Sequence, residues 1–272
     1  MLWSNWNALE KHYHHQQSRR HYIACPLTET ERPPSPAARQ LYTALLAGDL
    51  PQVQHVVHQG GAKTEYLCYH SDNLHLPPFR TPLFVALWLQ HDDIAAFLLQ
   101  TENAKQPRRG IMREFAIACG EASISLSQLR TVVQYFGKNL HVGHANNATA
   151  AGLTPLHYAC FQGHWPLTKY LMQQGADWHA RATEQALTPL HVLQYNPQRP
   201  DDLGNCVAWL LNHHHHHHHQ HRDKNTVRSL LLLTDKDGRT VLQHVLQQAN
   251  ADTRNYCIVH MVQRIRHEKR VP

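Results

Sequence analysis

One stretch, residues 152–179 (GLTPLHYACFQGHWPLTKYLMQQGADWH), restricts the fold of this chain more than any other. Its first part predicts the start of a helix, because Thr154 can cap a helix with its hydroxyl group. Pro155 then occupies the first helical position, where its fixed φ is suitable and its missing N–H costs nothing. Three apolar residues follow at i, i+3 and i+4, namely Leu156, Ala159 and Cys160. This spacing predicts a short helix with a narrow apolar face.

The second part of the stretch predicts another helix, antiparallel to the first. Gly163 is suited to end the first helix, since glycine readily takes the left-handed conformation that follows many helices. An apolar stripe with helical spacing recurs at Leu167, Tyr170 and Leu171. The sequence Gly-Ala-Asp at 175–177 favours a turn after this helix. We therefore expect a helix, a turn, a second helix and a loop that leads to the next unit.

This pattern resembles the ankyrin repeat, whose T-P-L-H-x-A signature stands here at 154–159. Two further signature segments follow in the expected order, Gly163-His164 and Gly175-Ala176-Asp177. The resemblance implies an all-α solenoid of stacked helix-turn-helix repeats with short β-hairpin or finger loops. It also implies that His157 and His191 are structural residues, which hydrogen-bond near the repeat turn and fix the spacing of neighbouring repeats.

The signature recurs along the chain. Thr188-Pro189-Leu190-His191 lies 34 residues after the first copy, close to the ankyrin period of about 33 residues. Thr81-Pro82-Leu83 opens an upstream copy, and a repeat without the signature fits between the two, with Phe115-Ala116-Ile117-Ala118 in its first helix. The first repeat lacks the opening turn and is predicted to be an N-terminal cap, while the last is predicted to be a C-terminal cap. We expect about six repeats, near 37–63, 79–101, 109–137, 150–180, 186–212 and 235–266.

The array is expected to cover residues 37–268, which suffices for a continuous core, since such arrays need at least about 3 repeats. Residues 1–36 form an N-terminal extension that ends in a proline-rich linker, and residues 269–272 form a basic tail. Trp3 and Trp6 are spaced to form a short helix that covers the open end of the first repeat. A loop insertion at 212–226 contains an unbroken run of histidines at 213–219.

The composition favours a soluble protein of the reducing cytosol. The chain has 26 basic and 20 acidic residues, a net charge of +6 with its 26 histidines neutral, which raises solubility more than it indicates a nucleic-acid partner. No cysteine pair has CxxC spacing, and Cys119, Cys160 and Cys257 fall on helical stripes, as reduced core thiols do. No apolar run reaches the ~18 residues of a membrane span. We expect a cytoplasmic monomer, located in a host-cell cytosol if the protein is a secreted effector.

The histidine run offers an alternative function. Neutral imidazoles bind zinc, nickel and copper, so the loop at 212–226 is a candidate metal- or pH-responsive element. A structural zinc site, however, needs ligands at fixed separations on a folded frame, and no other Cys or His has the spacing to complete one. We therefore interpret the run as a low-complexity loop and expect no cofactor.

Two basic patches offer a further alternative, the binding of phosphate or nucleic acid. The first patch contains Lys105, Arg108, Arg109 and Arg113, and the second contains Arg264, Arg266, Lys269 and Arg270. Neither belongs to a nucleic-acid motif, and no basic stripe runs along the array. We interpret both as solvated surface and expect no nucleic-acid partner.

The common catalytic patterns are missing from the sequence. It has no Gly-rich phosphate loop, no G-x-S-x-G and no H-E-x-x-H. Cys25 and His21 lie close together in sequence, but nothing supplies a third group that would orient them on a rigid element. The extension of about 36 residues is too short for a catalytic domain of its own. We therefore expect no enzymatic activity.

The resemblance implies a protein–protein interaction module, an adaptor or scaffold or an effector delivered by a bacterium, that binds its partner on the concave face. Five residues after the core leucine, three repeats carry an aromatic residue: Trp88, Phe161 and Tyr195. This position lies off the apolar stripe, so part of each ring is expected to face the groove. A polar rim is expected from Arg80, Gln162, Arg181, Glu184 and Gln185, since arginine and aromatic residues are enriched at binding hot spots. In the alternative interpretation the rings only fill gaps between repeats, as Gly120 occupies this position in the third repeat.

Overall fold

The computed structural model of the 272-residue chain describes residues 36–59, 81–101, 109–121, 123–136, 152–182, 186–193 and 232–247, and shorter pieces at 199, 201–202, 204–206, 251, 254–255, 258–259 and 262. It divides into two compact units. The first comprises Met1–Glu114 and Gln134–Phe136, and the second comprises Phe115–Val133 and Gly137–Pro272.

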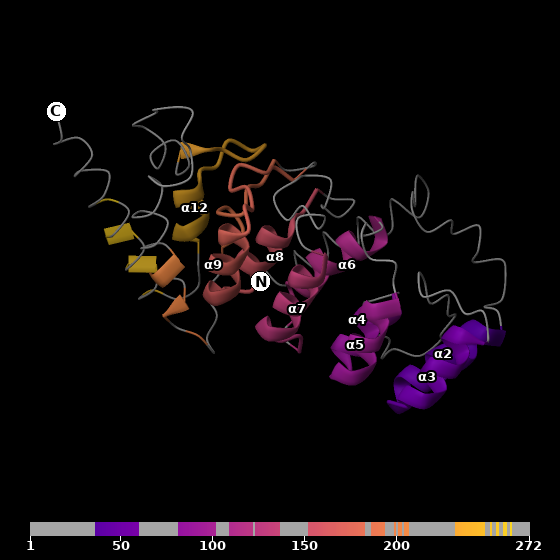
Figure 1. Ribbon diagram of the computed structural model, residues 1–272. Helices are drawn as coiled ribbons and strands as arrows, with labels where there is room; N and C mark the ends of the chain where they lie inside the picture. The colour runs from indigo at the N-terminus through magenta and orange to yellow at the C-terminus, as the bar shows by residue number, and fades with distance from the viewer. Residues whose placement is uncertain are drawn as a thin grey trace. The chain divides into compact units, whose positions relative to one another are not determined.

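The first unit contains two antiparallel helix pairs. Helix α2 (Pro36–Ala47) packs against α3 (Leu50–His58), and α4 (Pro82–Trp88) packs against α5 (Asp92–Thr101), as Figure 1 shows. The pairs also contact each other through α2 with α4 and through α3 with α5. Helix α6 (Arg109–Ala118) starts in this unit and ends in the second. Stacked helix pairs of this kind are the arrangement that the repeat pattern predicts.

Local sequence explains where these helices begin and end. Asp49 caps α3, because its carboxylate accepts the N–H of Gln52 at 3.0 Å, and a proline stands in the first turn. Gly48 connects α2 to α3 with a φ of 69°, a value that suits glycine. A side chain at Gly48 would also meet the ring of His91, since its Cβ would lie 2.9 Å from the imidazole Cε1. The first turn between paired helices is therefore fixed by backbone conformation and by close packing.

The second unit contains α7 (Leu126–Phe136, without its last three residues), α8 (Pro155–Phe161), α9 (Trp165–Gln173) and α12 (Val241–Leu246). Helix α8 begins at Pro155 after an extended Thr154, as predicted, and it packs against α9. Gly163 and Gly175 end these two helices with φ values of 58° and 88°, which confirms their predicted roles as helix terminators.

The second copy of the signature differs from the expectation. Thr188-Pro189-Leu190-His191 forms turns instead of a regular helix, with His191 N–H donating to the Thr188 carbonyl at 2.9 Å and Leu193 N–H to Leu190 at 3.4 Å. Such i to i+3 bonds close turns, whereas an α-helix requires i to i+4 bonds. The described part of the chain has no sheet, only a single bridge between Thr234 and Thr240, so the all-α class is confirmed.

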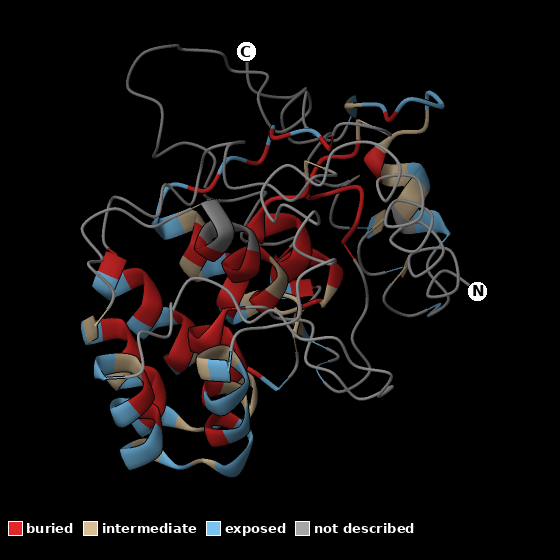
Figure 2. Cartoon of the chain, turned by 90° about the vertical axis from the view of Figure 1, so that its right-hand side faces the viewer, coloured by how far each residue is buried: buried red, intermediate tan, exposed pale blue. Residues whose placement is uncertain are grey.

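The core lies where the paired helices face each other. Figure 2 shows helices with buried residues on one side and exposed residues on the other. In α5, for example, Ile94 and Leu98 are buried while Asp92 and Asp93 are exposed, the pattern of an amphipathic helix. Cys119 and Cys160 are buried free thiols, which confirms the prediction that they belong to the core. Among the described residues, no helix is long and apolar enough to cross a membrane.

Candidate functional site

The turn at the start of α8 is held by His157. Its Nδ1 accepts the backbone N–H of Thr154 at 3.1 Å and lies 2.8 Å from the Thr154 hydroxyl, while its Nε2 lies 3.0 Å from the carbonyl oxygen of Leu187. A carbonyl only accepts hydrogen bonds, so Nε2 carries the proton and Nδ1 is the acceptor. Burial lowers the pKa of His157, the hydrogen bond to Leu187 raises it and the nearby His191 lowers it, and together they bring it to about 4. The imidazole is therefore neutral at pH 7 and joins α8 to the turn before the next signature, as the resemblance implies.

His191 repeats this geometry in the next signature. The Thr188 N–H donates to His191 Nδ1 at 3.2 Å, and the Thr188 hydroxyl lies 2.8 Å from the same atom. The His191 ring meets the ring of His244 edge to face, with 5.2 Å between centroids. Burial lowers the pKa of His191, and His244 contributes in the same direction. Among the described residues its Nε2 has no hydrogen-bond partner. His191 therefore caps its own turn but, unlike His157, forms no hydrogen bond of ordinary geometry to the turn of the next repeat.

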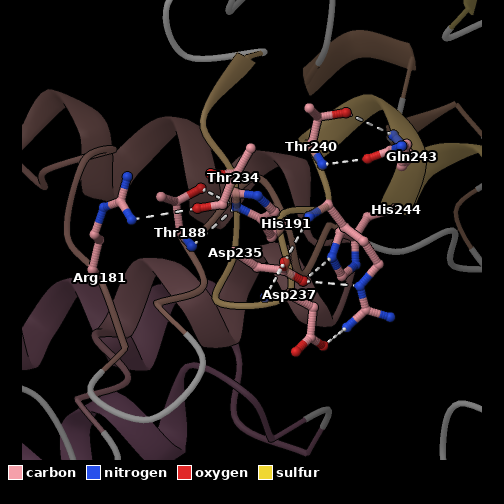
Figure 3. Close-up of polar contacts among 10 residues, drawn as sticks. Arg181, Thr188, His191, Thr234, Asp235, Asp237, Thr240, Gln243 and His244 are labelled. Atoms are coloured by element: carbon pink, nitrogen blue, oxygen red, sulfur yellow. Dashed lines mark hydrogen bonds and ion pairs between the residues drawn. The ribbon is translucent and has the colours of Figure 1, made fainter.

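A buried carboxylate, Asp235, organises the turn before α12 (Figure 3). It accepts the backbone N–H groups of Asp237 and Arg239 at 2.9 and 2.8 Å, the Arg239 Nε at 3.1 Å and the His244 Nε2 at 2.9 Å. Burial alone would raise the pKa of Asp235, but the hydrogen bonds from His244 and Arg239 and their charges outweigh it and lower the pKa. The turn is therefore rigid, and the side chains of Lys236 and Asp237 project from it into solvent.

The loop after α9 is also well fixed. Trp178 is buried in it, the Ala182 N–H donates to the Leu187 carbonyl at 2.9 Å, and the His179 N–H donates to the Asp177 carboxylate at 2.9 Å. Asp177 and His179 nevertheless remain exposed. A buried anchor with exposed polar neighbours gives the loop a defined surface.

Arg181 joins this loop to the turn before α12. Its Nη1 donates to the Thr234 carbonyl at 3.4 Å, across 53 residues of sequence, and the side chain stays exposed (Figure 3). Five exposed residues of the two segments with ionisable side chains are here called the loop surface; they are Asp177, His179, Arg181, Lys236 and Asp237. This surface presents both charges on backbones that are already ordered.

The predicted partner-binding residues fall into three groups: residues that are exposed or half-buried, residues outside the described part of the chain, and one residue that is buried. Arg181 is exposed, whereas Trp88 at the end of α4 and Gln162 at the end of α8 are half-buried. Trp88 lies in the first unit, and Gln162 and Arg181 lie in the second. The remaining predicted residues, Arg80, Glu184, Gln185 and Tyr195, lie outside the described residues.

The third group is Phe161 alone, whose predicted exposure is wrong. Its side chain is only 6 % exposed, like every other residue of α8, none of which reaches the surface. The reason is that α8 has neighbours on several sides. Tyr158 packs so closely on Gly120 that a Cβ there would lie 2.8 Å from the ring, and His157 bonds to the Leu187 turn. The alternative interpretation, in which this ring belongs to the packing, fits Phe161.

Sequence reasoning missed the residue that caps α4. In this copy Phe84 occupies the position of the signature histidine, and the carboxylate of Glu114 accepts the Thr81 N–H instead. Both groups are buried. The available signal was the spacing, because Glu114 follows Thr81 by 33 residues, one repeat period. It also missed the Asp235 turn and the bond of Arg181 to Thr234.

The residues that the structure describes give no support for a metal site or a nucleophilic cysteine. They contain no cluster of three or more His, Cys, Asp or Glu residues that could hold a metal ion. Burial raises the pKa of the Cys119 thiol, and it raises that of the Cys160 thiol to about 12, so neither thiol is an activated nucleophile. The histidine run at 213–219 and the second basic patch lie outside the described residues, as do the side chains of the first patch.

A family model described as ankyrin repeats (3 copies) matches residues 122–223. The fold is similar to that of an ankyrin repeat domain from Acinetobacter baumannii AYE, with a TM-score of 0.53 and 19% identity over 84% of this chain and 97% of that one. It is also similar to a second ankyrin repeat protein, with a TM-score of 0.54 and 15% identity over 83% of this chain and 98% of that one. No curated protein matches the sequence.

Proposed function

The chain is an ankyrin-repeat protein, and on that premise we propose that it binds a protein partner through the loop surface of its second unit. Ankyrin repeats are generic protein–protein interaction modules, and their fold is typically that of a binding module without enzymatic activity.

The observation that carries the proposal is the bond between Arg181 and Thr234. It connects two loops that are each rigid by themselves, through Trp178 in one and Asp235 in the other. Loops ordered before binding lose little conformational entropy when a partner binds, which favours affinity. Their exposed Asp177 and Lys236 supply charges of both signs, which favour specificity and rapid association, while Asp237 is ion-paired with Arg239 at 2.6 Å.

The proposed binding residues are the exposed and half-buried members of the predicted set, extended by the loop surface. In the second unit they are Gln162 and Arg181, while Trp88 of the first unit and Arg80, Glu184, Gln185 and Tyr195 stay predictions. Phe161 is left out because it is buried. The monomeric state, the cytosolic location and the role as an adaptor or a delivered effector also stay predictions.

The test is capture of a partner by the intact chain. The full chain and its Arg181→Ala variant would be used as baits in cytosolic lysate, captured proteins would be identified by mass spectrometry, and the dissociation constant of the purified partner would then be measured. Arg181→Ala should weaken binding by about tenfold or more, as expected for a hot-spot arginine. Thermal unfolding of the variant should change little, since its bond to Thr234 is long and exposed.

A matched control is Arg39→Ala, which removes an exposed arginine from α2 in the first unit. It should leave binding unchanged. Equal affinity of wild-type protein and Arg181→Ala for the purified partner would refute the loop surface as the binding site. A deletion of residues 212–220 tests the histidine loop in the same assay, and loss of binding in that variant alone would favour the histidine run instead.

A further inference from the structure

An arginine of α7 stacks on a tyrosine of α9 in the second unit. Arg130 of α7 lies over the ring of Tyr170 of α9, with 5.0 Å between the guanidinium carbon and the ring centroid. Arg130 is exposed and Tyr170 is half-buried. Burial raises the pKa of the Tyr170 phenol, against the charge of Arg130, so the ring stays neutral at pH 7. Stacking on a neutral ring restrains the guanidinium without consuming its N–H donors.

These helices leave their positive charge uncompensated. Lys169, next to Tyr170, is also exposed, and neither α7 nor α9 contains an acidic residue. Within the described residues, neither Arg130 nor Lys169 belongs to an ion pair. Two carboxylates lie near the ends of α9, where Asp202 accepts the Trp165 N–H at 3.1 Å and Asp177 accepts the His179 N–H, and neither forms an ion pair with Arg130 or Lys169. Five guanidinium donors therefore face solvent in a fixed orientation.

We infer that Arg130, Lys169, Tyr170 and Gln173, here called the outer patch, bind an acidic peptide segment of a protein. The planar guanidinium suits a carboxylate, which it can bind through two parallel hydrogen bonds. Lys169, the residue before Tyr170 in α9, is exposed and can bind a second carboxylate, and the exposed amide of Gln173, one turn after Tyr170, can bond to the peptide backbone. The outer patch shares no residue with the loop surface, and its binding is tested without it.

The geometry favours a peptide over a phosphate group. Phosphate sites commonly use the free N–H groups at a helix N-terminus. In α9 those groups are occupied, because Trp165 N–H donates to Asp202 and Leu167 N–H donates to His164 Nδ1 at 3.3 Å. The outer patch offers side-chain donors alone, which suits carboxylates spaced along a chain.

The experiment uses a fluorescein-labelled hexaglutamate peptide and the full chain. Fluorescence anisotropy would be measured at low ionic strength and pH 8, where histidines of ordinary pKa are neutral. Arg130→Gln should weaken binding by about tenfold, since a charge-assisted hydrogen-bond pair is lost. Tyr170→Leu removes the stack and should weaken binding by about threefold, whereas Tyr170→Phe should bind within about twofold of wild type.

Arg39→Gln is the matched control, because it removes the same charge from an exposed site on the first unit. If Arg39→Gln and Arg130→Gln reduce binding equally, the peptide responds to net charge only and the outer patch is refuted. A single-stranded oligonucleotide of equal charge serves as competitor. If it binds more tightly than the peptide and shows the same dependence on Arg130 and Tyr170, the occupant is a nucleic acid and the inference is wrong. Circular dichroism of each variant confirms that the fold is retained, so that a loss of binding can be assigned to the patch.

Discussion

Thr81 and Glu114, 33 residues apart, are joined by three hydrogen bonds, in which the Thr81 N–H lies 3.2 and 2.9 Å from the two carboxylate oxygens and the Thr81 hydroxyl donates to one of them. In the fourth repeat the corresponding cap is local, since His157 binds Thr154 three residues away. The copy that begins at Thr81 carries Phe84 in place of the local histidine and takes its acceptor from the following repeat. Removal of this acceptor should therefore affect two repeats together.

The first prediction concerns Glu114→Ala. It leaves the buried N–H of Thr81 without an acceptor, which should lower the free energy of unfolding by roughly 1 to 3 kcal/mol. Urea unfolding at pH 7 measures the change. Gln100→Ala, an exposed substitution on α5, is the control and should stay within about 0.5 kcal/mol of wild type. An unchanged midpoint for Glu114→Ala would show that water replaces the carboxylate at no cost.

The second prediction concerns the core of the fourth repeat. Leu156 is fully buried, so Leu156→Ala should cost roughly 2 to 5 kcal/mol. Leu246→Ala makes the same chemical change at a side chain that is 42% exposed and should cost about 0.5 kcal/mol or less. Both values come from the midpoint and slope of urea unfolding. Similar costs for the two variants would place Leu156 outside the core.

The third prediction compares two glycines with positive φ. Gly175→Ala meets open space and should cost about 1 to 2 kcal/mol for its left-handed backbone alone. Gly48→Ala should cost more, because its methyl group also meets the His91 ring. In a His91→Ala background the extra cost should disappear, which a double-mutant cycle of thermal unfolding can measure. If Gly48→Ala still costs more than Gly175→Ala in the absence of His91, the extra cost comes from the backbone and not from the imidazole.

The fourth prediction concerns pH. The pKa of His157 is about 4 in the folded protein and about 6.5 in an unfolded chain, so the unfolded state binds more protons between these values. Stability should therefore fall as the pH drops from about 6.5 toward 4, by up to roughly 3 kcal/mol from this residue. His164, whose pKa is lowered mainly by burial, acts in the same direction. Asp235 has a lowered pKa and loses its contribution only under more acidic conditions.

His157→Gln tests this assignment. The cap at the start of α12 shows that a glutamine can take the place of the histidine, since Gln243 Oε1 accepts the Thr240 N–H there at 2.7 Å. The variant should keep the turn and lose part of the pH dependence, measured as urea midpoints at pH 7.5, 6 and 5. The same slope in both proteins would mean that other groups cause the acid sensitivity.

The sequence alone predicted the features that depend on neighbouring residues. The start of α8 at Pro155 and the glycine terminators follow from local conformational preferences, and both are confirmed. Exposure was harder to predict. Phe161 lies off the apolar stripe of its own helix, yet it is buried. Helix α8 has neighbours on other sides as well, since Tyr158 packs on Gly120 and His157 bonds to the Leu187 turn. The helical spacing of α8 alone does not predict these neighbours.

Long-range polar contacts were equally hidden. The bond of Arg181 to Thr234 spans 53 residues, including the insertion, so no repeat spacing indicated it. The cap of Thr81 by Glu114 was missed because Phe84 stands at the position of the histidine, although the spacing of one repeat between Thr81 and Glu114 was a signal for it. In physical terms, a backbone N–H must find an acceptor but does not specify which residue supplies it.

The caps at Thr81 and His157 bear on the order in which the chain folds during synthesis. The first is completed by Glu114, 33 residues later, and the second by Leu187, 30 residues later. A ribosome delivers residues from the N-terminus onward, so each of these helices emerges before the group that completes its cap. These two repeats are therefore finished only when their successors have been translated, and their ordered structure follows the growing end of the chain at a distance of about one repeat.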